Sequence, residues 1–200
     1  MQRRTVAIVL FDEVEVLDFA GPFEVFSVCG RRSQLDPFEV YTVSERGQTV
    51  RARNGLIVTP LHSFASAPSP DLLLVPGGFG TRREMKNPVM LEWVVRQGRG
   101  CEFLLSVCTG ALILACAGLL DGLAATTHHL AFDELRAVAP RTDIREGVRI
   151  VDNGRVVLSS GVSAGIDMSL HMVSRLLGDD LARETARYME YEGNWSSAGH

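Results

Sequence analysis

The chain has 200 residues, enough for one substantial hydrophobic core but too few for two domains of ordinary size. Hydrophobic residues make up 46% and charged residues 22%, and the formal net charge of −4 gives no indication of a nucleic acid or an anionic membrane as a partner. The longest apolar stretch, Ala111–Leu120, is too short to span a bilayer, and the N-terminus lacks a signal-peptide pattern.

The first half of the chain alternates apolar β-rich runs with helical segments. Pro22 suits the first turn of a helix, which we expect to end at Val28, near Gly30. A second helix is bounded by a proline at its start and Gly98 at its end. The expected strands are Thr5–Phe11, Phe38–Val43, Gly55–Thr59 and Asp71–Val75, and the second helix is Pro88–Gln97.

The second half opens with a strand, a sharp turn at Cys108 and a helix. The pair Asn153-Gly154 is a strong hairpin signal between two further strands. We expect strands at Glu102–Val107, Val148–Val151 and Arg155–Ser159, helices at Thr109–Ala117, Leu130–Val138, Ser163–Leu177 and Asp180–Tyr191, a single domain over residues 1–193 and a polar tail over 194–200.

This alternation, with several continuously apolar strands, predicts an α/β sandwich whose sheet is mostly parallel and covered by helices on both faces. Ligands bind such folds beyond the carboxyl ends of the strands. Asp18, Gly77–Gly80 and Cys108 each follow a predicted strand, so we expect them to converge there.

Cys108 is the first candidate for chemistry. The positive end of a helix favours the thiolate over the thiol, and the thiolate is the nucleophile. The other three cysteines show neither a CxxC pattern nor metal-ligand spacing, so we expect Cys29, Cys101 and Cys116 to be reduced, small buried hydrophobes of a cytoplasmic protein.

Asp18 stands in an otherwise apolar setting just before the expected helix. It could cap that helix, or it could serve as a functional acid, and the pattern favours neither. A carboxyl group near a thiolate is expected to have a raised pKa, which would suit it to exchange a proton with the cysteine.

The segment Pro76–Gly80 could form a simple tight turn, or it could present backbone N–H groups to a reacting atom. It matches neither a GxGxxG motif nor a Walker loop, so we expect no nucleotide, and no cofactor is expected elsewhere. His128 and His129 lack the neighbouring pattern of a metal site, so we expect no metal. His128 is either a hydrogen-bonding residue near the site or a helix-start histidine. Residues 161–167 favour close packing over a pocket role.

A glutamine amidotransferase would pair its cysteine with a downstream His-x-Glu. His171-Met172-Val173 is the comparable spot here and lacks the acid, so this interpretation is weak.

Six motifs, in order along nearly the whole chain, resemble the DJ-1/PfpI superfamily. They are Asp18–Phe26, Pro76–Gly78, Ser106–Ala111, Ala117–Gly122, Ala125–His128 and Ala164–Asp167. The resemblance implies a flavodoxin-like three-layer α/β/α sandwich with a cysteine nucleophile elbow, commonly as a homodimer.

Within the superfamily, Asp18 before Gly21-Pro22 and Thr109 after Cys108 are similar to the isonitrile hydratase-like proteins. Peptidase-type and glyoxalase-type relatives carry histidine after the nucleophile. By this resemblance Cys108 would be the nucleophile, Asp18 the acid/base and Thr109 a hydrogen-bonding partner. Gly77, Gly78, Phe79 and His128 would line the substrate site of an enzyme that hydrates isonitriles.

The same motifs are similar to the sensor domains of AraC-type regulators, which continue into a DNA-binding domain. This chain ends at His200, so we expect a small-molecule ligand and no nucleic-acid partner. A ligand-binding or redox-sensing module without turnover, and glyoxalase-type activity, stay open as alternatives.

Overall fold

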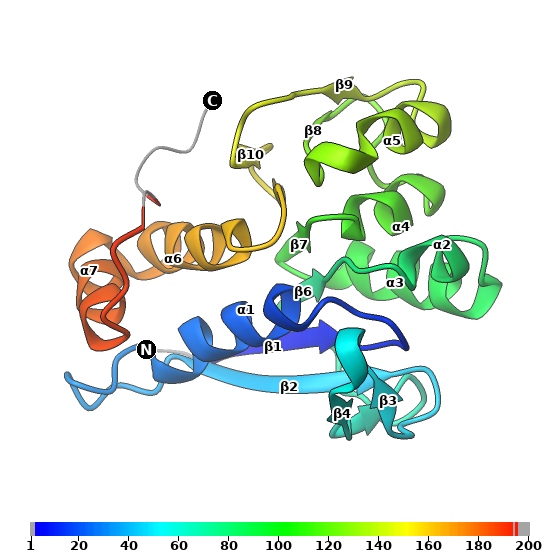
Figure 1. Ribbon diagram of the computed structural model, residues 1–200. Helices are drawn as coiled ribbons and strands as arrows, with labels where there is room; N and C mark the ends of the chain where they lie inside the picture. Colours follow the sequence, from blue (N-terminus) through cyan, green and yellow to red (C-terminus); the bar gives the residue numbers. More distant parts are fainter. Residues whose placement is uncertain (1–2, 194, 196–200) are drawn as a thin grey trace.

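In the computed structural model, which describes residues 3–193 and 195, a seven-stranded sheet lies between two groups of helices (Figure 1). Its strands are β1 (Arg4–Val9), β2 (Phe38–Ser44), β5 (His62–Ser63), β6 (Leu72–Val75), β7 (Phe103–Val107), β10 (Ile150–Asp152) and β11 (Val156–Ser159). Two small ribbons pair β3 (Val50–Arg51) with β4 (Ile57–Val58) and β8 (Ala124–Ala125) with β9 (Asp143–Ile144).

The strand order is β10-β11-β7-β6-β1-β2-β5. Only the hairpin pair β10 and β11 is antiparallel, and every other neighbouring pair in this sheet is parallel. The predicted mostly parallel α/β sandwich is therefore confirmed. The hairpin prediction is also confirmed, with Gly154 in the turn at a φ of 81°.

The helices form two groups of neighbours. In the first, α1 (Val16–Val28), α6 (Ala164–Leu177) and α7 (Asp179–Tyr188) pack against one another, and in the second, α4 (Gly110–Cys116) contacts α2 (Thr81–Glu84), α3 (Pro88–Gly100) and α5 (Phe132–Val138). Leu104 approaches Gly98 of α3, whereas Val107 approaches Gly165 of α6. These two β7 side chains are three positions apart and so point to opposite faces, which places the two groups on opposite sides of the sheet.

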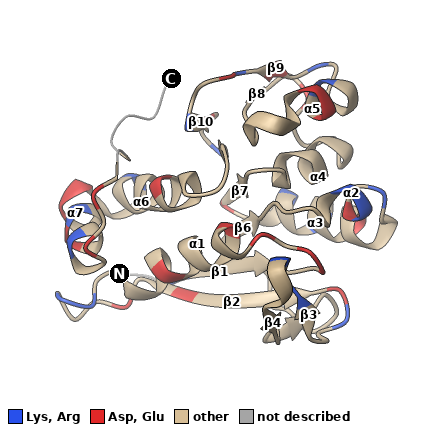
Figure 2. Cartoon of the chain, in the orientation of Figure 1, with Lys and Arg blue, Asp and Glu red and all other residues tan. Residues whose placement is uncertain are grey.

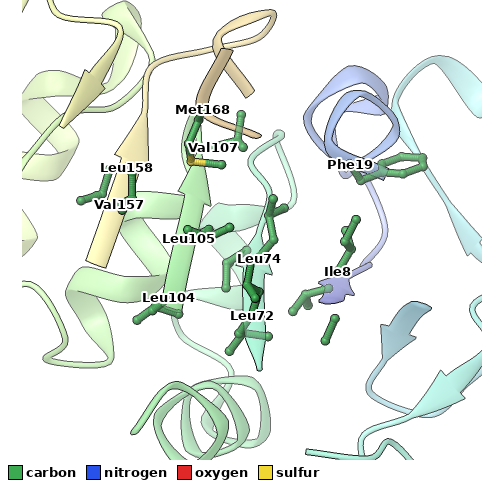
Figure 3. Close-up of a cluster of buried hydrophobic side chains, with 14 of the residues drawn as sticks. Ile8, Phe19, Leu72, Leu74, Leu104, Leu105, Val107, Val157, Leu158 and Met168 are labelled. Atoms are coloured by element: carbon green, nitrogen blue, oxygen red, sulfur yellow. The ribbon is translucent and has the colours of Figure 1, made fainter. Parts of the chain in front are cut away.

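The core fills the space between these layers. Leu72, Leu73 and Leu74 of β6 are completely buried, as expected for a strand covered on both faces. Figure 3 shows the side chains of β6 and β7 packed side by side, with Met168 of α6 beside Val107. Charged residues lie mainly on the helices and loops outside the sheet (Figure 2).

Helix α1 begins six residues before Pro22, so the expectation that Pro22 lies in its first turn is wrong, although the helix ends at Val28 as expected. Proline in a helix interior removes a hydrogen bond to the carbonyl four residues earlier, here that of Asp18. Close packing on α6 offsets this cost. A Cβ on Gly21 would lie 2.8 Å from Ile166 Cγ1, and the ring of Pro22 faces Gly165.

Other differences from the sequence predictions are local. The last helix ends at Tyr188 instead of Tyr191, and the short elements β3, β5, α2, β8 and β9 lack a sequence pattern long enough to predict. Of the predicted polar tail, only Trp195 lies within the described residues, and the predicted domain limits extend beyond them at the N-terminus. No helix in the described part of the chain is long and apolar enough to cross a membrane.

The site follows from this topology. Strands β1, β6 and β7 are neighbours, and their carboxyl ends lead into the segments that carry Asp18, Gly77 and Cys108. The chain runs outward from β1 to β2 and β5 and then returns to β6 on the other side of β1. Such a change of direction is where α/β sheets hold their ligands.

The start of α4 is pressed against the end of β6. A Cβ on Gly110 would lie 2.1 Å from the carbonyl oxygen of Val75, so Gly110→Ala forces backbone to move. We expect this variant to lose about 1–3 kcal/mol of unfolding free energy in urea denaturation. Gly100→Ala is the matched control, since a Cβ there meets nothing within 4 Å. Equal stability of the two variants would contradict this account of the turn.

Candidate functional site

Cys108 lies in the turn between β7 and α4 with a φ of 57°, a left-handed conformation that few residues other than glycine adopt. Its N–H donates to the carbonyl of Ser159 at 3.1 Å. Its own carbonyl accepts from the hydroxyl of Thr127 at 2.9 Å. Hydrogen bonds on both sides thus hold the strained turn, one from the neighbouring strand and one from the segment after β8.

Asp18 lies in the first turn of α1 and is completely buried. The N-cap position belongs to Glu15, so the capping alternative for Asp18 is wrong. Its Oδ2 instead accepts a hydrogen bond of 3.0 Å from the N–H of Gly77. Its Oδ1 is buried with no hydrogen-bond partner among the described residues, which leaves one carboxyl oxygen available for other chemistry.

Asp18 and Cys108 are neighbours. Asp18 Oδ2 and Cys108 Cβ each lie 2.8 Å from the position that a Cβ on Gly77 would occupy. The two atoms are therefore separated by at most twice that distance. The close approach of the thiol and carboxyl groups that the sequence suggests is present.

Burial raises the pKa of Asp18 to about 7, while the Gly77 N–H and the Cys108 thiol pull it down. The carboxyl pKa is raised, as expected, but the cause is burial and not repulsion from a neighbouring thiolate. Asp18 can hold or release a proton near neutral pH, the condition for efficient proton transfer.

Cys108 differs from expectation. Its side chain is only 5% exposed, and burial raises the pKa of its thiol. The Asp18 carboxylate raises this pKa further, while the N–H and hydroxyl of Thr109 lower it. The expectation that the helix end favours the thiolate is wrong, because loss of hydration and a neighbouring negative charge outweigh the local dipole.

The glycine-rich segment 76–80 uses its backbone N–H groups to position side chains of other segments. The Gly77 N–H donates to Asp18, and the Gly78 N–H donates to the hydroxyl of Thr109 at 3.0 Å. Both N–H groups therefore already donate within the protein. The alternative that these two amides are presented to a developing oxyanion is wrong. The adjacent amides instead fix the side chains of Asp18 and Thr109.

His128 approaches Cys108 across Gly161. A Cβ on Gly161 would lie 2.4 Å from His128 Cδ2 and 3.0 Å from Cys108 Sγ. Burial, and then the positive charges of His129 and Arg82, lower the pKa of His128, so its ring is neutral at pH 7. Its Nδ1 accepts from the Leu130 N–H at 3.3 Å, which leaves Nε2–H as the donor.

Phe79 follows Gly78 and is 67% exposed. Its ring lies beside the guanidinium groups of Arg53 and Arg82. Arg82 forms a bidentate ion pair with Glu134 of α5. A second exposed apolar side chain, Leu130, follows His128 and is 77% exposed. The surroundings of the thiol are therefore polar and buried, while two apolar side chains stand further out in solvent.

The sequence predictions missed two residues of this site. The sequence favours a packing role for residues 161–167. Gly165 does pack on Val107, but Gly161 lies against the Cys108 thiol. Thr81 is buried with its hydroxyl on Gly78, and its only sequence signal is its place directly after the glycine-rich loop. All four cysteines are free, with Cys29 and Cys101 buried and Cys116 half-buried.

Residues 4–175 match the DJ-1/PfpI family. An isonitrile hydratase from Pseudomonas putida is 32% identical over 186 residues, which are 93% of this chain and 78% of that protein. The HTH-type transcriptional regulator GbdR of Pseudomonas aeruginosa is 30% identical over 191 residues, and this chain spans about half of it, 51%.

Solved structures agree with the fold. A ThiJ/PfpI family protein from Pseudomonas syringae superposes with a TM-score of 0.86 and 28% identity, over 97% of this chain and 77% of that one. DJ-1beta of Drosophila melanogaster gives a TM-score of 0.83 at 17% identity, over 96% of this chain and 100% of that one.

The buried Asp18 should make stability depend on pH. Its pKa rises from 3.8 to about 7 on folding, so the folded chain binds the proton more tightly. Stability is then lost as the pH rises from about 4 to about 7. Asp18→Asn removes this loss and should be more stable than the parent at pH 8 by a few kcal/mol, at about 1.4 kcal/mol per pKa unit.

Urea denaturation between pH 4 and pH 8 measures this difference. Asp133→Asn, at a fully exposed carboxylate on α5, is the control for the loss of a charge. A difference between Asp18→Asn and the parent that stays constant or grows toward acid would contradict the raised carboxyl pKa.

Gly161→Ala tests the contact between His128 and Cys108. The added methyl group overlaps the His128 ring and touches the sulfur. Because this methyl group covers the sulfur, iodoacetamide alkylation of Cys108 should slow roughly tenfold, which corresponds to about 1.4 kcal/mol in the activation barrier. Mass spectrometry of the Cys108 peptide gives the rate. An unchanged rate in a folded Gly161→Ala variant would mean that this glycine does not shape the site.

Proposed function

Because this chain belongs to the DJ-1/PfpI family, we propose that it is an isonitrile hydratase-like enzyme that converts an isonitrile into an N-substituted formamide. The observation that carries this proposal is the buried carboxyl of Asp18, whose pKa is raised to about 7 beside the Cys108 thiol. One of its oxygens has no hydrogen-bond partner among the described residues. The similarity to the Pseudomonas putida enzyme over 93% of the chain supports it.

The proposed reaction needs a nucleophile and a proton carrier. The Cys108 sulfur attacks the terminal isonitrile carbon and forms a carbon–sulfur bond, while Asp18 takes the thiol proton and delivers it to that carbon. The product of this step is a thioimidate. Water then adds to the same carbon, and one of its protons goes to the nitrogen. As the carbon–sulfur bond breaks, the second proton goes to the sulfur and the oxygen becomes the carbonyl, which releases the formamide and restores the thiol. No electrons are gained or lost overall, and no cofactor is required.

The raised thiol pKa fits this sequence of steps. The Cys108–Asp18 pair can exist as a neutral thiol with an ionised carboxylate or as a thiolate with a protonated carboxyl group. These two states differ only in the position of one proton. Burial disfavours a second negative charge in the pair. Asp18 can therefore act as base during attack and as acid when the carbon is protonated.

We assign the remaining residues by their positions. Thr109 supplies the N–H and hydroxyl that lower the pKa of the Cys108 thiol. Gly77 and Gly78 hold Asp18 and Thr109 in place through their amides. His128 contributes a neutral N–H donor, and Phe79 offers an apolar surface to the substituent on the isonitrile nitrogen.

A second candidate is a sensor that binds a small molecule without turnover. Two observations favour it: the 30% identity to the regulator GbdR over 94% of this chain, and a thiol that is buried with a raised pKa. Both candidates place the small molecule beside Cys108 and Asp18. They differ in whether the bound molecule is transformed.

We further propose that the protein is a cytoplasmic homodimer. Four large apolar side chains remain exposed in one chain: Leu17 and Phe23 of α1, Ile57 of β4, and Leu56 directly before β4. Burial between two copies would remove them from water. Sedimentation of the parent and of Phe23→Glu tests this, since a monomeric parent would rule the dimer out.

Isonitrile turnover is the decisive measurement. The parent should release N-substituted formamides from a panel of small isonitriles, and Cys108→Ala should lose at least about a thousandfold in rate because the nucleophile is gone. Asp18→Asn should also lose most of the activity. Cys116→Ala, at a half-buried free thiol, is the matched control and should retain it.

Other outcomes separate the alternatives. Lactate formed from methylglyoxal would favour glyoxalase-type chemistry. Binding of a panel member without product would favour the sensor, and formamide release that survives Cys108→Ala would overturn the proposed mechanism.

A further inference from the structure

Residues 160–163 join β11 to α6 and lie against the reacting thiol. The Cys108 N–H lies 3.1 Å from the Ser159 carbonyl oxygen and 3.3 Å from that of Ser160. The Cys108 sulfur lies 3.0 Å from the position that a Cβ on Gly161 would occupy. Whatever fixes the 160–163 segment therefore also fixes the cover over the thiol.

Arg149, directly before β10, holds both ends of this segment. Its backbone carbonyl accepts from the Ser160 N–H at 2.9 Å. Its Nη2 donates to the Ser163 hydroxyl at 3.3 Å. The peptide groups of Ser160 thus join Arg149 on one side to Cys108 on the other.

The guanidinium of Arg149 is held in turn by Asp167 in the first turn of α6. The Asp167 carboxylate is almost completely buried, and its Oδ2 accepts from Arg149 Nε at 2.6 Å and contacts Nη2 as well. Its Oδ1 accepts from the Tyr191 hydroxyl at 2.9 Å. Because Arg149 is half-exposed, water competes for its donors, and the buried carboxylate fixes where they point.

We propose that Asp167 is a positioning residue, which acts through Arg149 to hold the 160–163 segment against the reacting thiol. The same segment lies against the His128 ring, so its placement also sets the gap between this ring and the Cys108 sulfur. For turnover the inference rests on the proposed function, but the accessibility of the thiol tests it without any substrate.

The location of the Asp167–Arg149 pair favours this role over simple attachment of α6. Asp152 of β10 already pairs with His171 at 2.7 Å and with Arg175 at 2.8 Å, one and two turns further along α6. These contacts tie the β10–β11 hairpin to the helix without Asp167. The Asp167–Arg149 pair lies instead at the start of α6, where the segment that covers the thiol enters the helix.

The test follows iodoacetamide alkylation of each cysteine by mass spectrometry of its peptide. In Asp167→Asn the guanidinium loses its charged acceptor, so the 160–163 segment opens more often and Cys108 should react about tenfold faster. Cys29 and Cys101 are buried to a similar degree, at the ends of α1 and α3. Their rates report general loosening of the fold and should stay at the parent value.

Two further variants sharpen the test. Arg149→Lys keeps a positive charge beside Asp167 but replaces the planar guanidinium with one ammonium group, so it should fold and also accelerate Cys108. Asp152→Asn neutralises the other paired carboxylate between the hairpin and α6. It is the matched control and should leave the Cys108 rate unchanged.

Three results would overturn the inference: a parent-like Cys108 rate in folded Asp167→Asn, equal acceleration of Cys29 and Cys101, or the same acceleration in Asp152→Asn. If Asp167→Asn does not fold, the Cys108 rate in Arg149→Lys decides in its place. Absence of isonitrile turnover in the parent would count against the proposed function alone, since the alkylation rates do not depend on it.

Discussion

The backbone at Gly77 lies so close to the turn at Cys108 that a single methyl group has no room between them. A Cβ there would stand 2.5 Å from the Thr109 nitrogen and 2.8 Å from both Cys108 Cβ and Asp18 Oδ2. This contact joins the ends of β6 and β7 to the first turn of α1. The Gly77 and Gly78 amides consequently reach Asp18 and Thr109, and the thiol becomes enclosed. Cys108 and Asp18 are both buried at this contact. Burial raises the pKa of each group, although the Gly77 N–H lowers that of Asp18.

The sequence is informative wherever a local pattern decides the structure. Continuous apolar runs predict the central strands, and the turn at Cys108 is visible as an apolar run that leads into a Cys-Thr-Gly segment. Non-local contacts decide the rest. Pro22 lies inside α1 because packing on α6 offsets its missing hydrogen bond, and that packing involves residues far along the chain. A helix-start pattern therefore misplaces the beginning of α1.

In the candidate site, too, local patterns identify some features and non-local contacts decide the others. The residue types at 18, 108 and 109 mark it, but the sequence does not show which hydrogen-bonding groups the fold already uses. The Gly77 and Gly78 amides look free in a glycine-rich loop and are both donated to side chains of other segments. Likewise, the dipole of α4 is a local property that favours the thiolate. Dehydration and the Asp18 charge depend on the assembled fold, and they determine the direction of the thiol pKa.

The left-handed backbone at Cys108 has a consequence for how this turn can change over evolution. At a φ of 57° any residue with a Cβ carries a conformational penalty of about 1–2 kcal/mol, which glycine does not. Folding alone would therefore favour glycine at position 108. A lineage that no longer needed the thiol would gain stability by replacing cysteine with glycine, so we expect cysteine at this position only where its chemistry is used.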